Sequence, residues 1–155
     1  MFKKKKLELL AVCDGKISPL SSINDEAFAS GMLGVGYALS PTSNIFRSPV
    51  SGIVENVADT RHAYTIVGET GEEVLIHIGI DTVSLGGDCF ESKVTSGVRV
   101  FAGEPIARVD LDRLKNKGFD PSCAVIVTNS DILKSHTVNS GMAIGGKTVA
   151  FVGKM

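Results

Sequence analysis

Short segments with the character of β-strands follow one another along almost the whole chain. Each is rich in β-branched or other apolar residues and is bounded by Gly, Pro, Asp or Asn, the pattern of strands separated by tight turns. The series predicts an all-β (mainly), antiparallel fold, a β-sandwich or flattened barrel, in which each sheet buries one face. The 17 glycines agree with a chain rich in turns. The predicted strands lie near 7–13, 15–18, 36–39, 45–47, 52–58, 63–68, 73–80, 98–101, 105–109, 123–128 and 147–152.

Helical segments are few and short. The predicted helices are Asp25–Leu33, Leu111–Gly118 and Ser130–Ser135. Asp25 is placed to cap the first helix, and Gly118 to end the second. No segment has the composition of a long linker, so we expect 1–155 to form a single domain, with 1–6 as a flexible basic tail.

Charge and cysteine content exclude several classes of protein. The net charge of -1 provides no global field that would attract nucleic acid. No apolar run approaches the roughly 20 residues of a membrane span, so we expect no stable membrane insertion. The three cysteines have no metal-like spacing and are expected to be free thiols in a reducing compartment, the cytoplasm. They are Cys13, Cys89 and Cys123.

Two pairs of segments resemble each other within the chain. Ala11–Ile17, AVCDGKI, resembles Ser48–Val54, SPVSGIV, in the position of a Gly before a β-branched residue. Val100–Val109, VFAGEPIARV, resembles Ala143–Val152, AIGGKTVAFV, which shares a Gly followed two residues later by a β-branched residue, Ala and Val. Matching hairpins favour a duplicated framework, although turn-and-strand patterns also recur by chance in β proteins.

A histidine interrupts the most apolar of the predicted strands. Val74, Ile76 and Ile78 would point into the core, because side chains alternate along a strand. His77 would point the opposite way. Its neighbour on that face, Gly79, has no side chain and is expected to leave room above the imidazole.

A second histidine lies one hairpin upstream. If the turn around Gly71 has an even number of residues, Tyr64 or His62 pairs with His77, and both rings lie on one face of the sheet. A three-residue loop would place the histidines on opposite faces. The even loops are the more common geometry, so we expect His62 beside His77.

Paired imidazoles admit several chemistries. A lone strand histidine is usually structural, but two on one face next to a glycine indicate a functional site. His62 and His77 could act as acid–base groups, as a nucleophile with its partner, or, with Asp81, as ligands of Zn²⁺ with an open position. The third possibility keeps a zinc hydrolase of β-sandwich type among the hypotheses.

A long stretch around the histidines resembles a known family. SPVSGIVENVADTRHAYTI and GEEVLIHIGIDTVSLGGDCF resemble the glucose-type IIA domain of the bacterial phosphoenolpyruvate-dependent sugar phosphotransferase system. The first motif of that family ends in Thr, one residue and His, here Thr60 to His62. The second centres on His77. Weaker matches, among them AVCDG and GEPI, extend over nearly the whole chain.

The resemblance implies a phosphoryl carrier with a phosphohistidine intermediate. His77 would accept the phosphoryl group from phospho-HPr and pass it to a cysteine of a IIB domain for sugar uptake and phosphorylation. His62 would stabilise the phosphoryl oxygens, and Thr60 would orient His62. No cofactor is required, and any Zn²⁺ on the histidines would be adventitious or regulatory. A phosphorylation-dependent regulatory module that binds further proteins is an alternative compatible with this role.

A carrier of this kind docks two proteins on one surface, which requires a shape-tolerant apolar patch around the histidines. Asp81 is expected on its rim, and the Gly79 carbonyl is expected to fix the tautomer of His77. Glu26, Ala27 and Ala58 stand where the family has larger apolar residues, so this patch is expected to be smaller or more polar. The residues expected to bind partners are Phe28, Met32, Leu33, Tyr64, Gly79, Asp81 and Val83.

Overall fold

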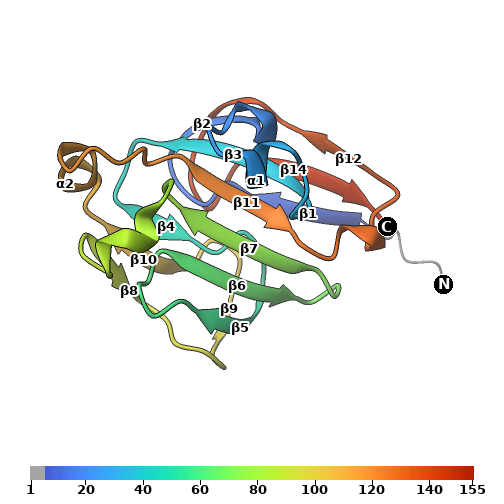
Figure 1. The fold of residues 1–155 in the computed structure, drawn as a ribbon. Coiled ribbons are helices and arrows are strands. Elements are labelled where there is room, and N and C mark those ends of the chain that lie inside the picture. Colours follow the sequence, from blue (N-terminus) through green and yellow to red (C-terminus); the bar gives the residue numbers. More distant parts are fainter. Residues whose placement is uncertain (1–5) are drawn as a thin grey trace.

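The structure, a computed structural model, describes residues 6–155 and is built almost entirely of strands (Figure 1). The strands are β1 (Lys6–Leu10), β2 (Gly15–Pro19), β3 (Val35–Pro41), β4 (Ile45–Arg47), β5 (Gly52–Val57), β6 (Ala63–Gly68), β7 (Glu73–Ile78), β8 (Phe90–Ser92), β9 (Arg99–Val100), β10 (Pro105–Val109), β11 (Cys123–Val127), β12 (Ser135–Val138), β13 (Gly141–Ala143) and β14 (Val149–Lys154). The helices are α1 (Glu26–Ala29) and α2 (Leu111–Asn116), with 3-10 turns η1 (Leu20–Ser22), η2 (Thr82–Leu85) and η3 (Ser130–Ile132).

Three open antiparallel sheets form the architecture. The large sheet has the order β13-β2-β3-β11-β7-β6-β5-β9, and two three-stranded sheets have the orders β1-β14-β12 and β4-β10-β8. All pairings between described strands are antiparallel. The antiparallel sandwich predicted from the sequence is therefore confirmed, without a closed barrel among these residues.

The core lies between the large sheet and the two small ones. Strand alternation supplies it: in β7, Val74, Ile76 and Ile78 are buried while the residues between them are only partly covered. Both tyrosines, Tyr37 and Tyr64, are fully buried there. A second, smaller cluster lies on the outer face of the large sheet, where η1 and α1 pack. It comprises Leu20, Ile23, Phe28, Ala38, Ala124 and Ile126.

The predicted duplication is visible in the strand order. If β1–β3 are exchanged with β4–β6, and β7–β10 with β11–β14, the large sheet reads the same from either end and the small sheets exchange places. The pseudo-twofold axis passes between β7 and β11, the central pair of the large sheet. The turns at Gly103 and Gly146, which belong to the second pair of repeated segments, lie against each other. A Cβ on Gly103 would lie 3.1 Å from the Gly146 carbonyl oxygen. The two repeats are thus interleaved along the chain.

Several predicted boundaries were wrong. The first predicted helix, Asp25–Leu33, is a single turn, α1, because Gly31 and Gly34 adopt positive φ directly after it. The third is only the 3-10 turn η3. The predicted basic tail lies outside the described residues except for Lys6, which begins β1 opposite Lys154. Strands β8, β12 and β13 were missed because they are short, and β12 is polar and exposed.

Candidate functional site

His77 lies on the outer face of the large sheet near the end of β7. Its Nδ1 is 2.9 Å from the carbonyl oxygen of Gly79, which can only accept a hydrogen bond. Nδ1 therefore carries the proton and donates, and the lone pair of the neutral ring is on Nε2. The predicted role of the Gly79 carbonyl in fixing this tautomer agrees with the observed contact.

Gly79 is required by its backbone and by its close neighbour Thr82. Its φ of 84° belongs to the left-handed region, which glycine enters without strain. A Cβ at this position would lie 2.3 Å from Cγ2 of Thr82. The expectation of free space above the imidazole was therefore wrong, because Thr82 fills it. The Thr82 hydroxyl in turn donates to the Ile78 carbonyl at 2.6 Å and closes the turn.

The hairpin register differs from both predicted even-loop alternatives. Ala63 pairs with His77 and Tyr64 pairs with Ile76, so residues 69–71 form a three-residue loop. Glu72 stabilises this loop: its carboxylate accepts from the backbone N–H of Thr70 and from its hydroxyl. A regular strand in this register would carry His62 and His77 on opposite faces.

The two imidazoles nevertheless meet. Their ring centroids are 4.9 Å apart in an edge-to-face arrangement of 83°. His62 precedes the first residue of β6, and the chain reaches it through a turn in which Arg61 has a φ of 57°. The histidines are thus brought together by this turn at the strand entrance, and not by the strand pairing from which their proximity was predicted.

Thr60 holds the second histidine. Its Oγ1 lies 2.5 Å from Nδ1 of His62, the contact expected from the sequence. When the hydroxyl donates to Nδ1, the proton of the neutral ring is on Nε2, and that N–H is available for an acceptor beside His77. His62 is only 7% exposed, and the ring of Phe90 is another neighbour of its imidazole, at 6.5 Å between centroids.

Both histidines are neutral at physiological pH. Burial, and then the proximity of His77, lowers the pKa of His62 to about 4. Burial also lowers the pKa of His77, against the opposing effects of its hydrogen bond to Gly79 and of the nearby carboxylates of Asp25 and Asp81. A neutral imidazole retains the lone pair that a nucleophile requires.

The predicted partner-binding residues fall into two groups. The ring of Phe28, from α1, lies 4.9 Å from that of His77, and the left-handed Asp81 directly precedes η2, two residues after Gly79. Val83 in η2 is 58% exposed; Met32 and Leu33, directly after α1, are also exposed. Tyr64 does not belong with them: it pairs with Ile76 and is fully buried on the core side of the sheet.

Sequence reasoning missed two contributors to this site. Asp25 was identified only as a helix cap; it does accept from the N–H of Ala27, but its carboxylate also influences the His77 pKa. The contacts of Arg61 with the segment before β8 were not foreseen. Gly87 was a signal for them, since it leaves space for the guanidinium, but a glycine among several does not identify what occupies that space.

The metal hypothesis requires a third ligand. Within residues 6–155, no group of three or more His, Cys, Asp or Glu side chains is arranged to hold a metal ion. The proposed set of His62, His77 and Asp81 is therefore not assembled as a three-ligand zinc site. The described helices also include none that is long and apolar enough to cross a bilayer.

Comparison with known families gives one consistent match. The model of the family "phosphoenolpyruvate-dependent sugar phosphotransferase system, EIIA 1" matches residues 7–133. The glucose-specific EIIA component of Mycoplasma capricolum is 41% identical over 151 residues, covering 97% of this chain and 98% of that protein. The solved structure of glucose permease IIA from the same species superimposes with a TM-score of 0.88 at 40% identity, covering 97% and 98% of the two chains.

Some relatives carry the matching region inside a larger protein. The glucose-specific EIICBA component of Streptococcus pneumoniae serotype 4 is 40% identical over 147 residues. The alignment covers 95% of this chain but only 20% of the pneumococcal protein. The described chain thus corresponds to one part of such multidomain relatives.

Proposed function

The chain belongs to the EIIA 1 family of the phosphoenolpyruvate-dependent sugar phosphotransferase system and is a phosphoryl carrier of that system, and we propose that Nε2 of His77 carries the phosphoryl group. The observation that supports this assignment is the hydrogen bond from Nδ1 of His77 to the Gly79 carbonyl, which leaves Nε2 as the nucleophilic atom. Alternatives based on hydrolysis at zinc have no such support.

The transfer itself places few demands on the protein. Nε2 attacks the phosphorus of the donor phosphohistidine, a new N–P bond forms, and the donor imidazole leaves with the electrons of the old bond. Such reactions depend mainly on in-line positioning and on stabilisation of the equatorial oxygens. The low pKa of His77 keeps Nε2 unprotonated and ready to attack near pH 7. No cofactor is required in this mechanism.

His62 provides the stabilisation in this proposal. With Nδ1 held by the Thr60 hydroxyl, its Nε2–H would donate to a phosphoryl oxygen on His77, whose ring lies 4.9 Å away. A preorganised donor of this kind lowers the barrier because it needs no reorganisation during the reaction. In this proposal His62 donates and His77 accepts, because His62 is only 7% exposed and its Nδ1 is held by Thr60.

We propose the two partners from the family to which the chain belongs. The donor is phospho-HPr, and the acceptor is a cysteine of a IIB domain, whose thiolate attacks the phosphorus and releases His77 unchanged. A cytoplasmic location is part of this proposal, because both partners would have to reach His77 there. The fused EIIB and EIIC parts of several relatives agree with an acceptor of this type. Phe28, Met32, Leu33 and Val83 would form the apolar docking surface, with Asp81 on its rim.

Intact-mass measurement tests the assignment. The chain is incubated with phosphoenolpyruvate, Enzyme I and HPr, as wild type, His77→Ala and His62→Gln. We expect one acid-labile phosphoryl group on the wild type and none on His77→Ala. The His62→Gln variant should accept the group but transfer it poorly to a IIB domain. A phosphorylated His77→Ala protein would overturn the assignment of the accepting atom.

A further inference from the structure

The residue between Thr60 and the second histidine has an unusual backbone. Arg61 has a φ of 57°, one of three positive values among the described non-glycine residues. Long side chains adopt this region at a cost of roughly 1–3 kcal/mol, and they persist there only where their surroundings hold them. One such contact is the hydrogen bond from the Arg61 N–H to the Ala58 carbonyl, at 2.7 Å.

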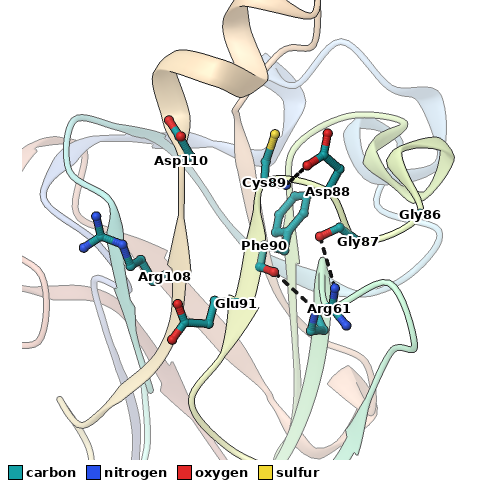
Figure 2. A pocket seen from close by; sticks show the side chains of 9 residues that line it. All are labelled: Arg61, Gly86, Gly87, Asp88, Cys89, Phe90, Glu91, Arg108 and Asp110. Atoms are coloured by element: carbon teal, nitrogen blue, oxygen red, sulfur yellow. Dashed lines mark hydrogen bonds between the residues drawn. The ribbon is translucent and has the colours of Figure 1, made fainter.

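The guanidinium supplies the other contacts. Nε donates to the carbonyl of Phe90 at 3.2 Å, and one terminal nitrogen donates to the carbonyl of Gly87 at 3.3 Å, as Figure 2 shows. A Cβ on Gly87 would lie 2.6 Å from that nitrogen, so a larger residue here would displace the guanidinium from its observed position. A planar fork with two donors fits two carbonyls of one loop in a way that a lysine ammonium does not.

These bonds join the turn of His62 to the segment that packs against its ring. Arg61 donates hydrogen bonds to the backbone carbonyls of Gly87 and Phe90. The ring of Phe90 faces the imidazole of His62, with 6.5 Å between the ring centroids. Phe90 is itself 6% exposed, at the start of β8. The adjacent residues Arg61 and His62 therefore contact the same segment, Arg61 through hydrogen bonds and His62 through its ring.

The acidic groups around the guanidinium have other partners. Asp88, Glu91 and Asp110 line the same cavity, of about 390 Å³ (Figure 2). Asp88 pairs with Arg113 and Lys117, Glu91 pairs with Lys93, and Asp110 caps α2. Among the described residues, the hydrogen bonds of the Arg61 side chain thus go to backbone carbonyls, which indicates a role in fixing the loop.

We propose that Arg61 is a positioning residue: it fixes the direction of the imidazole of His62 toward His77 by tying the turn of residues 58–62 to the backbone at Gly87 and Phe90. This inference rests on the proposed function, in which His62 donates to the phosphoryl oxygens on His77. Displacement of a donor by about 1 Å is enough to reduce the rate of a transfer substantially. Arg61 itself does not contact the reacting atoms in this assignment.

The decisive variant removes the guanidinium of Arg61 but keeps the left-handed backbone at position 61. Arg61→Gly tolerates the positive φ and lacks both side-chain hydrogen bonds, and Arg61→Asn serves the same purpose if the glycine variant does not fold. Arg61→Lys retains the charge without the planar fork. The matched control is Arg108→Gly, which removes a cation from the same cavity but whose side chain has no hydrogen bond to Gly87 or Phe90.

Two readouts separate positioning from other effects. In single-turnover transfer from ³²P-labelled phospho-HPr, we expect Arg61→Gly to lower the maximal rate about tenfold at an unchanged half-saturating donor concentration. Arg108→Gly should keep the wild-type rate. Independently of any donor, the ¹⁵N and ¹H resonances of the His62 ring, and its nuclear Overhauser contacts with Phe90, should change in Arg61→Gly and remain in Arg108→Gly.

Each outcome decides one question. Unchanged His62 resonances and an unchanged rate in Arg61→Gly would overturn the positioning role. Full recovery of rate and resonances in Arg61→Lys would also overturn it, because charge alone would then suffice. Failure of the folded wild type to accept the phosphoryl group would refute the proposed function, whereas the resonances would still report whether Arg61 holds the ring of His62.

Discussion

Two equivalent connections of the duplicated fold differ in length, and that difference separates a closed face from an open one. The connection from β2 to β3 occupies residues 20–34 and contains η1 and α1, whose Leu20, Ile23 and Phe28 cover the outer face of the sheet. Its counterpart from β5 to β6 occupies only residues 58–62. It contains no helix or 3-10 turn, the outer-face residues of β6 are only half-buried, and the connection ends in His62.

The strand registers identify equivalent positions in the two repeats. With Ile76 and Val125 paired at the centre, the pseudo-twofold axis relates His77 to Ile126, and Tyr64 to Tyr37. Ile126 is fully buried beneath η1 and α1, whereas His77 lies at the edge of that cover, against Phe28. The same scaffold thus provides a packed position at Ile126 and a reactive position at His77. The long β2–β3 connection covers the first, and the short β5–β6 connection does not cover the second.

Exchange of the residue types at these positions is expected to have the largest effect. Ile126→His would place an imidazole without a hydrogen-bond partner beneath the cover, so we expect the free energy of unfolding to fall by about 3 kcal/mol. Urea denaturation measures it. Ile126→Leu, which conserves volume, is the control and should cost less than about 1.5 kcal/mol. A histidine variant as stable as the leucine variant would show that the cover does not exclude polar groups.

Acid should destabilise the protein through the open half, where His62 lies. The pKa of His62 is about 4 in the folded protein and 6.5 in the unfolded chain, so the unfolded state binds more protons between these pH values. Stability should therefore rise with pH across this window and fall by about 3 kcal/mol on acidification from pH 7 to pH 4 through this group.

The control for the acid effect is His62→Gln, which is uncharged at every pH. Its unfolding free energy, measured by urea titration at intervals from pH 4 to pH 7, should lack most of the decrease seen in the wild type. His77 contributes with the same sign, because burial lowers its pKa too. Parallel pH profiles for the two proteins would contradict the assigned His62 pKa.

The difference between the halves also explains what the sequence could predict. Strand alternation correctly placed His77 outside the core, and the family motif pointed to Thr60 as the partner of His62. The hairpin register was predicted wrongly, since a three-residue loop stabilised by the buried Glu72 replaced the commoner even loop. Periodicity also could not show that a left-handed Arg61 would turn His62 toward its partner, because that depends on carbonyls almost 30 residues away.

The buried tyrosines form the subtlest contrast between the halves. The Tyr37 hydroxyl donates to the Leu10 carbonyl at 2.7 Å and accepts from the Val12 N–H at 3.1 Å. In the other repeat the residue equivalent to Val12 is Pro49, which has no N–H to donate. The Tyr64 hydroxyl has no hydrogen-bond partner in residues 6–155. The Ser92 hydroxyl is near enough to affect the Tyr64 pKa but donates to the Val94 carbonyl.

Removal of each hydroxyl should therefore have unequal consequences. Tyr37→Phe leaves a buried donor and a buried acceptor unpaired, so we expect a loss of about 1–3 kcal/mol in unfolding free energy. Tyr64→Phe removes a buried polar group that has no partner, so its effect should lie within about 0.5 kcal/mol of zero or be stabilising. Urea denaturation of both variants at pH 7 compares them directly. Equal losses would mean that the Tyr64 hydroxyl is bonded, through a buried water molecule for example, and that the repeats are alike here after all.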